Sequence, residues 1–121
     1  MRRMLLVAVA LAGCTGVPRA ESMRDVMVKV ERPLRAFTLC FAHGLDEHRP
    51  DLEHNVVRLA DGAFEVRTQA YRQPPVMVNR LQGTARGIAV TTRVHTATPP
   101  PAEWLEAVDE AIEDCDGRKQ P

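Results

Sequence analysis

The chain of 121 residues has almost no serine and lacks a recognisable arrangement of nucleophile and base of the kind that enzymes use for catalysis. Ser22 is the single serine, and it stands where a helix cap is expected, which argues against a serine nucleophile. The glycines near Gln82 belong to a turn between predicted strands, so no glycine-rich phosphate loop is present. No apolar run approaches the roughly 20 residues of a transmembrane helix. The sequence therefore predicts a protein that is not an enzyme and needs no cofactor.

The N-terminal segment is basic at its start and apolar in its middle. Arg2 and Arg3 precede the apolar run 4–11, and small residues follow it. This arrangement is typical of an export signal that is removed from the mature protein. We therefore assign residues 1–13 to a signal peptide and leave them out of the predicted fold.

The end of this signal, Leu11-Ala12-Gly13-Cys14, resembles the lipobox of bacterial lipoprotein precursors. The resemblance implies that the Cys14 thiol receives a diacylglyceryl group and that Cys14 becomes the acylated N-terminus. Two or more acyl chains anchor a protein stably, whereas one binds reversibly. Thr15 stands where Gram-negative lipoproteins retained at the inner membrane usually have aspartate. The resemblance thus implies the cell envelope and, in a Gram-negative source, the periplasmic side of the outer membrane.

Neither sign of charge dominates the chain. It has 16 basic and 16 acidic residues, and removing Arg2 and Arg3 with the signal leaves 14 and 16, a net charge of −2. This balance is too close to neutral to predict nucleic-acid binding. The expected partners are a membrane, through the lipid anchor, and another envelope protein.

Cys40 and Cys115 remain once Cys14 is assigned to lipid. Two cysteines in an oxidising compartment usually pair. The pair would close a loop of about 76 residues, for which the chain-entropy model gives roughly 4–5 kcal/mol at 25 °C. We therefore predict a Cys40–Cys115 disulfide.

The segment between Ser22 and Gly44 has apolar residues three and four positions apart, namely Met23, Val26, Met27, Val30, Leu34, Phe37 and Phe41. This spacing predicts an amphipathic helix that starts near Ser22 and stops at Gly44. Pro33 conflicts with it, because an interior proline removes a helix hydrogen bond. Two interpretations stay open: a helix kinked or broken at Pro33, which we favour, or a strand over 25–31 followed by a helix from Pro33.

The middle of the chain alternates in the manner of β-strands. Apolar and polar residues alternate around Val57 and Leu59, again over 64–70, in a shorter stretch at 76–81, and most clearly over 88–95. Asp61-Gly62 is a strong two-residue hairpin turn. Together these stretches predict a four-stranded antiparallel meander with one buried face.

A second amphipathic helix follows the prolines at 99–101 and stops at Gly117. One face carries Trp104, Leu105, Val108, Ala111, Ile112 and Cys115, and acidic residues occupy most of the rest. Cys40 lies beside the apolar stripe of the first helix. If both helices pack on one face of the sheet, the two thiols approach each other, which supports the disulfide.

Two polar groups are candidate sites. His43, His48 and His54 lie among Asp46, Glu47, Asp51 and Glu53 in a segment predicted to be a loop. They are weak metal-ligand candidates, since their spacing matches no compact ligand motif. Four arginines, Arg58, Arg67, Arg80 and Arg93, lie on or near strand faces opposite apolar positions. They indicate either a basic sheet face that binds a partner or, more in keeping with isolated surface arginines, an ordinary hydrated face. Trp104 is expected in the core and Tyr71 on the sheet face.

The sequence thus predicts a signal peptide (1–13), a lipidated tether (14–21) and one small α+β domain (22–121). The domain would consist of an N-terminal helix, a four-stranded meander and a C-terminal helix on one sheet face. The predicted function is that of a membrane-anchored, non-catalytic interaction module of the bacterial envelope. The alternative is a periplasm-facing protein that binds a small ligand or a metal through the His43–His54 segment.

Overall fold

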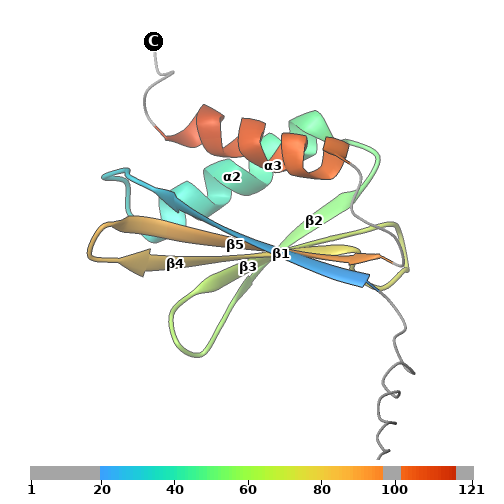
Figure 1. Cartoon of the computed structure of the whole chain (residues 1–121), viewed down its shortest axis with the longest axis horizontal. Helices are drawn as coiled ribbons and strands as arrows, with labels where there is room; N and C mark the ends of the chain where they lie inside the picture. The colour runs from blue at the N-terminus through green and yellow to red at the C-terminus, as the bar shows by residue number, and fades with distance from the viewer. Residues whose placement is uncertain (1–19, 97–101, 117–121) are drawn as a thin grey trace, which may run out of the picture.

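The structure is a computed structural model that describes residues 20–96 and 102–116. Two helices lie on one face of a five-stranded antiparallel sheet (Figure 1). The elements in chain order are β1 (Ala20–Val28), α2 (Leu34–His48), β2 (Glu53–Arg58), β3 (Phe64–Gln69), β4 (Met77–Thr84), β5 (Gly87–Thr96) and α3 (Ala102–Cys115). The α+β class and the placement of α3 are as predicted.

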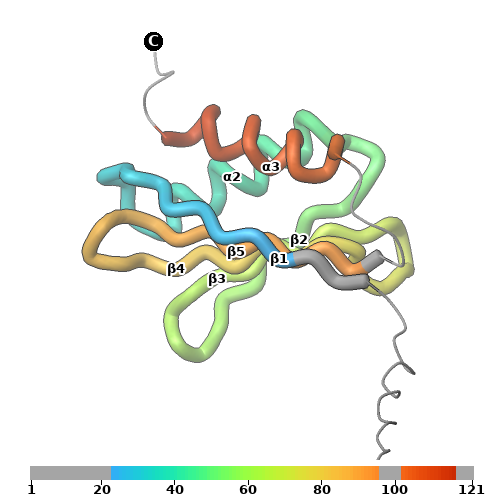
Figure 2. Tube along the Cα trace, viewed as in Figure 1, coloured from blue at the N-terminus to red at the C-terminus, as the bar shows by residue number. Residues whose placement is uncertain are grey.

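The sheet has the strand order β1-β5-β4-β3-β2. Strands β2 to β5 form the predicted antiparallel meander, and β1 adds to it as a fifth strand beside β5 (Figure 2). In β5 the alternation is confirmed, because Ile88, Val90, Thr92 and Val94 are all buried. The sequence prediction of four strands was therefore one strand short.

The favoured prediction of a helix before Pro33 was wrong. Residues 20–28 form β1, in which Val26 lies opposite Val90 of β5, and α2 begins only at Leu34. Pro33 occupies the N-cap position, where a proline costs no helix hydrogen bond. The segment 23–28 satisfies both a helical and an alternating pattern, and pairing with β5 decides for the strand. The same pairing places Ala20 and Glu21 in β1 instead of in the predicted tether.

Gly44 does not stop the helix, which continues to His48. Gly44 is buried, and a Cβ built on it would lie 3.0 Å from the Cβ of Ala111 on α3. The glycine therefore allows the two helices to approach closely. The predicted polar loop from His43 to His54 is correspondingly short, because only residues 49–52 separate α2 from β2.

The core lies between the two helices and the inner face of the sheet. Phe37, Phe41 and Leu45 of α2 are fully buried, and so are Val108, Ala111 and Cys115 of α3. They pack against Val66, Met77, Leu81 and Val90 of the sheet, which are also fully buried. Trp104 packs at the margin of this core, as predicted, whereas Tyr71 lies in the β3–β4 connection and not on the sheet face.

The structure joins Cys40 of α2 to Cys115 of α3 by a disulfide, with the two Cα atoms 5.9 Å apart. These are the two cysteines that the sequence analysis paired. Within the described ranges, no helix is both long and apolar enough to cross a membrane.

The Asp61-Gly62 pair lies in a connection of five residues, 59–63, and not in a two-residue turn. The carboxylate of Asp61 accepts a hydrogen bond from the amide of Ala63 at 3.1 Å, and the amide of Leu59 donates to the Ala63 carbonyl at 2.8 Å. Gly62 has a φ of 92°, which favours glycine at this position. The carboxylate thus supports a wider loop than the dipeptide alone suggests.

Candidate functional site

The predicted lipidation site lies outside the described residues. The signal peptide 1–13, Cys14 and Thr15 all precede residue 20, the first residue that the structure describes. The predicted stop at Gly117 likewise lies beyond the last described residue. The lipid anchor therefore stays a prediction, and the candidate sites with known geometry belong to the folded domain.

The three histidines of the candidate metal segment contact different partners. His43 lies 3.2 Å from Glu47 on the exposed side of α2. His48 lies between two carboxylates of α3, with Nδ1 2.9 Å from Glu110 and Nε2 3.1 Å from Asp114. His48 thus connects the end of α2 to α3.

His54 is different, because its side chain is fully buried. Its Nε2 donates to the carbonyl of Arg49 at 3.0 Å, and its Nδ1 lies 2.9 Å from the hydroxyl of Thr68. Arg49 also forms an ion pair with Asp51 in which its guanidinium donates a hydrogen bond to the carboxylate. This hydrogen bond holds the pKa of the Asp51 carboxyl below its ordinary value. The arginine carbon Cζ lies 4.3 Å from the centre of the Trp104 ring. These contacts hold the turn 49–52 in place.

In the part of the chain that the structure describes, no three His, Cys, Asp or Glu side chains are grouped so as to hold a metal ion. The sequence segment that suggested such a group is mostly helix and strand, which points its side chains in several directions. The structure thus does not bring His43, His48 and His54 together at one site.

The outer face of the sheet carries three of the four arginines singled out in the sequence. Arg67 pairs with Glu65 at 2.9 Å, and Arg80 pairs with Asp61. Arg93 contacts the sulfur of Met23 at 3.6 Å. Because Arg67 and Arg80 have acidic neighbours, this face resembles an ordinary hydrated sheet face more than a basic one.

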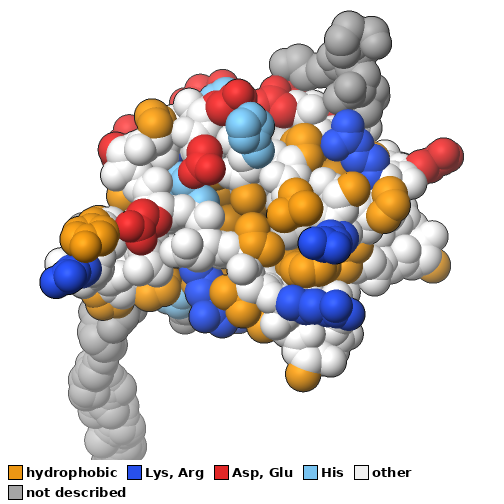
Figure 3. All heavy atoms as spheres, turned by 180° about the vertical axis from the view of Figure 1, so that it is seen from behind, with side chains coloured by type: hydrophobic (Ala, Val, Ile, Leu, Met, Phe, Trp, Pro, Cys, Tyr) orange, Lys and Arg blue, Asp and Glu red, His pale blue; other side chains and the backbone are white. Residues whose placement is uncertain are grey.

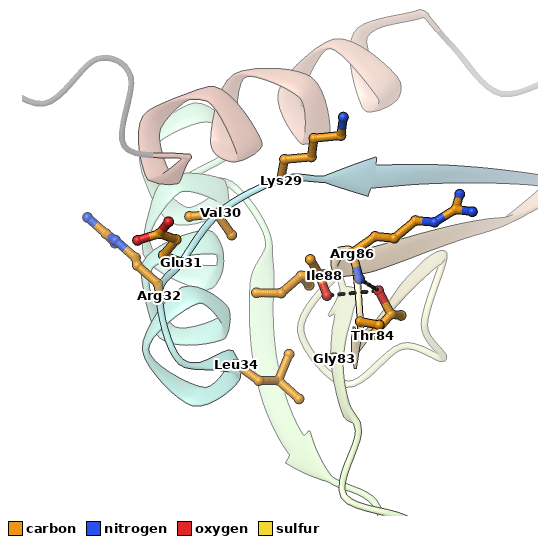
Figure 4. Close-up of a pocket in the computed structure, with 11 residues that line it drawn as sticks. Lys29, Val30, Glu31, Arg32, Leu34, Gly83, Thr84, Arg86 and Ile88 are labelled. Atoms are coloured by element: carbon orange, nitrogen blue, oxygen red, sulfur yellow. Dashed lines mark hydrogen bonds between the residues drawn. The ribbon is translucent and has the colours of Figure 1, made fainter.

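A hollow of about 490 Å³ lies between the β1–α2 connection and the β4–β5 turn (Figure 4). Three basic side chains border it: Lys29, Arg32 and Arg86. Figure 4 shows that these side chains point in different directions, while Leu34 and Ile88 face the interior. Because its charges do not converge, the hollow lacks the geometry of an anion site.

Arg58, the fourth arginine, lies on the opposite face of the sheet, in a groove between α2 and β2. The groove measures about 330 Å³ and is lined by Arg35, Thr38, Leu39, Val56, Arg58 and Phe64. We call it the α2–β2 groove. Leu39 and Val56 leave 49% and 37% of their surface exposed, respectively.

The α2–β2 groove combines these apolar side chains with charge of one sign. The side chains of Arg35 and Arg58 are both exposed, and neither guanidinium forms an ion pair or hydrogen bond with any described residue. None of the described residues that line the groove carries a carboxylate. From behind, the molecule shows apolar side chains interspersed with basic ones over the side that includes α2 and β2 (Figure 3). This arrangement can bind an apolar group and an anionic group at once.

Sequence analysis found only Arg58 of this groove. Leu39 stands off the apolar stripe that the helical spacing identified, and Val56 breaks the alternation around Val57. Because these two apolar residues fall outside the regular patterns, they were the signal in the sequence for an exposed apolar site. Their proximity depends on how α2 packs against β2.

Comparison with known proteins finds no family model that matches this chain, and no similar protein among the curated proteins compared.

Proposed function

We propose that this protein is a lipid-anchored, non-catalytic interaction module of the bacterial cell envelope, and that it contacts another envelope protein through the α2–β2 groove. The anchoring part of the proposal is supported by the lipobox resemblance at Leu11-Ala12-Gly13-Cys14. The interaction part is carried by the groove, where exposed Leu39 and Val56 lie beside two arginines. Exposed apolar surface flanked by polar groups is typical of interaction sites.

The anchor is tested by the unreduced mass of the protein extracted from native membranes. We expect a chain that begins at Cys14, is heavier by its acyl groups and is lighter by the two hydrogens lost in the Cys40–Cys115 disulfide. The Cys14→Ser variant is the control and should leave the membrane fraction. A chain without acyl groups, or one cut elsewhere, would contradict the anchor.

The interaction surface is tested by crosslinking in cells, with a photoreactive amino acid at Leu39. We expect one discrete crosslinked product, which weakens when Arg35→Glu and Arg58→Glu are added. The matched position is Glu106, which is exposed on α3. Equal crosslinking from both positions, or no effect of the charge reversals, would show that the α2–β2 groove is not the surface of contact.

A further inference from the structure

The groove lies beside an open edge of the sheet. Among the described strands β2 pairs only with β3, so the backbone amides and carbonyls on its other side have no strand partner. Such an edge is a template for an added strand. The opposite edge strand, β1, likewise pairs with only one of the described strands, β5, and its Arg24 side chain forms an ion pair with Asp109 of α3 at 2.7 Å. The α2–β2 groove, with its two arginines, adjoins the open edge of β2.

A strand added beside β2 would direct alternate side chains into the groove, because side chains alternate between the two faces of a sheet. Val56 and Arg58 are two residues apart and share the helix-facing side with their partners Val66 and Phe64. Helix α2 and strand β2 run in opposite directions from the connection 49–52 (Figure 1), so Arg35 lies toward the Arg58 end. The groove thus has an apolar end and a cationic end.

The positive charge of the α2–β2 groove determines which polypeptide segment can bind there. The segments of this chain outside the described residues, 1–19, 97–101 and 117–121, contain no aspartate or glutamate. A second copy pairing through β2 would bring a second Arg35 and Arg58 to a groove whose described lining residues carry no carboxylate, which charge repulsion disfavours. The complementary occupant is an acidic segment of another protein.

We propose that the α2–β2 groove binds an extended segment of another protein, which adds to β2 as a sixth strand. The segment places an apolar side chain beside Val56 and Leu39, and an acidic side chain two residues away beside Arg58 and Arg35. Backbone pairing supplies affinity and the two alternate positions supply specificity. This inference rests on the proposed function only in taking the groove as the surface of contact.

The test is peptide binding to the protein extracted in mild detergent, followed by fluorescence anisotropy. The probe is an eight-residue peptide of threonines with valine at two alternate positions and glutamate at the next two. It is made in both orders, since a parallel and an antiparallel strand require opposite orders. We expect one order to bind, weaker at about 1 M salt than at about 0.1 M because the screening length shortens. Failure of both orders to bind would overturn the proposal.

Two alterations of the peptide isolate the two kinds of contact. Replacing both glutamates by lysine should weaken binding roughly tenfold, because the arginines then repel the peptide. N-methylation of every second residue is made in both alternate sets. The set whose amides face β2 should abolish binding, because the peptide then loses the backbone donors needed for pairing, and the other set should not. Amide hydrogen exchange should slow in 53–58 on binding and stay unchanged in β1. Undiminished binding of both N-methylated peptides, or protection confined to β1, would exclude strand addition at β2.

The double variant Arg35→Glu, Arg58→Glu should bind roughly tenfold more weakly, since two ion pairs give way to repulsion. Both side chains are exposed, so the fold should be retained, and the melting temperature checks this. The double variant Lys29→Glu, Arg86→Glu changes the net charge equally and should bind as the parent does. An equal loss of peptide affinity in both variants would show that the effect comes from the net charge of the protein and not from the groove. A dimer that forms without peptide and dissociates in the first variant would identify a second copy as the occupant, against the proposal.

This assay separates the inference from the function on which it rests. No peptide binding, with the acylated mass and the Leu39 crosslink retained, would overturn strand addition alone. Peptide binding by a chain that lacks acyl groups would overturn the anchor alone.

Discussion

At the scale of single residues, Asp61 shows how one carboxylate organises a loop. It accepts a hydrogen bond from the Ala63 amide and pairs with Arg80 of β4. The amide hydrogen bond, followed by the one from Arg80, lowers the pKa of the Asp61 carboxyl below its ordinary value of 3.8. The side chain is therefore part of the β2–β3 connection and also reaches the outer face of the sheet.

A lowered pKa implies a defined pH dependence. Because the folded-state pKa lies below the unfolded value, the carboxylate stabilises the fold above the unfolded pKa, and this contribution is lost as pH falls through the folded-state pKa. We expect the parent to be more stable than Asp61→Asn at about pH 6 and the difference to be smaller near pH 2. Urea unfolding at both pH values measures it. A difference that is equal at both values would show that the charge does not contribute.

Single residues also explain why the alternative of a metal site at His43, His48 and His54 found no support in the geometry of the described residues. A list of histidines and carboxylates near one another in sequence says nothing about direction. The helix carries His43 to the solvent and His48 to α3, while β2 places His54 against Thr68. The sequence could predict the residue types here but not their separation in space.

At the scale of elements, the contact between α2 and α3 depends on Gly44. A Cβ at this position would meet the Cβ of Ala111 at 3.0 Å and its Cα at 3.1 Å. Neither neighbour is the end of a flexible side chain, so relief requires the helices to separate. A glycine predicted as a helix stop instead lies where the two helices approach each other closely.

The Gly44→Ala variant should therefore lower the free energy of unfolding by about 1–3 kcal/mol, the usual cost of overpacking, less up to about 1 kcal/mol that alanine recovers as a better helix former. Urea denaturation measures the change. Adding Ala111→Gly removes the opposing Cβ and should restore part of the loss. If Gly44→Ala alone were stabilising, the helices would have room that the structure does not show.

The N-terminal element shows where periodicity alone cannot decide. Val26 and Val28 face the core from β1, while Met23 and Met27 are exposed on the other side. Both a helical and an alternating pattern describe these residues. The strand forms because β5 offers an edge to pair with, and that edge lies more than sixty residues further along the chain.

At the scale of the whole molecule, the disulfide connects the two helices that cover the sheet. Cys40 and Cys115 are 75 positions apart, so the bond closes most of the folded domain into one loop. Cross-linking a loop of this length restricts the unfolded chain strongly. In a small domain with a modest core, this term is a large share of the total stability.

The Cys40→Ala, Cys115→Ala variant should lose roughly 4 kcal/mol of unfolding free energy, as the chain-entropy model predicts for a loop of this length. Chemical denaturation with and without reductant measures it. Reduction of the parent serves as the control and should give a similar loss. A change under about 1 kcal/mol would mean that the packing of α2 on α3 accounts for their association without the bond.

The sequence by itself determined the elements whose pattern is local. The alternation in 88–95, the apolar stripe of α3 and the pairing of Cys40 with Cys115 follow from side-chain periodicity and residue chemistry. The tertiary structure alone decided the strand at 20–28, the interior position of Gly44 and the groove that unites Leu39, Val56, Arg35 and Arg58. These depend on contacts between distant segments, because a strand needs an edge, a close approach needs a facing helix and a groove needs two walls.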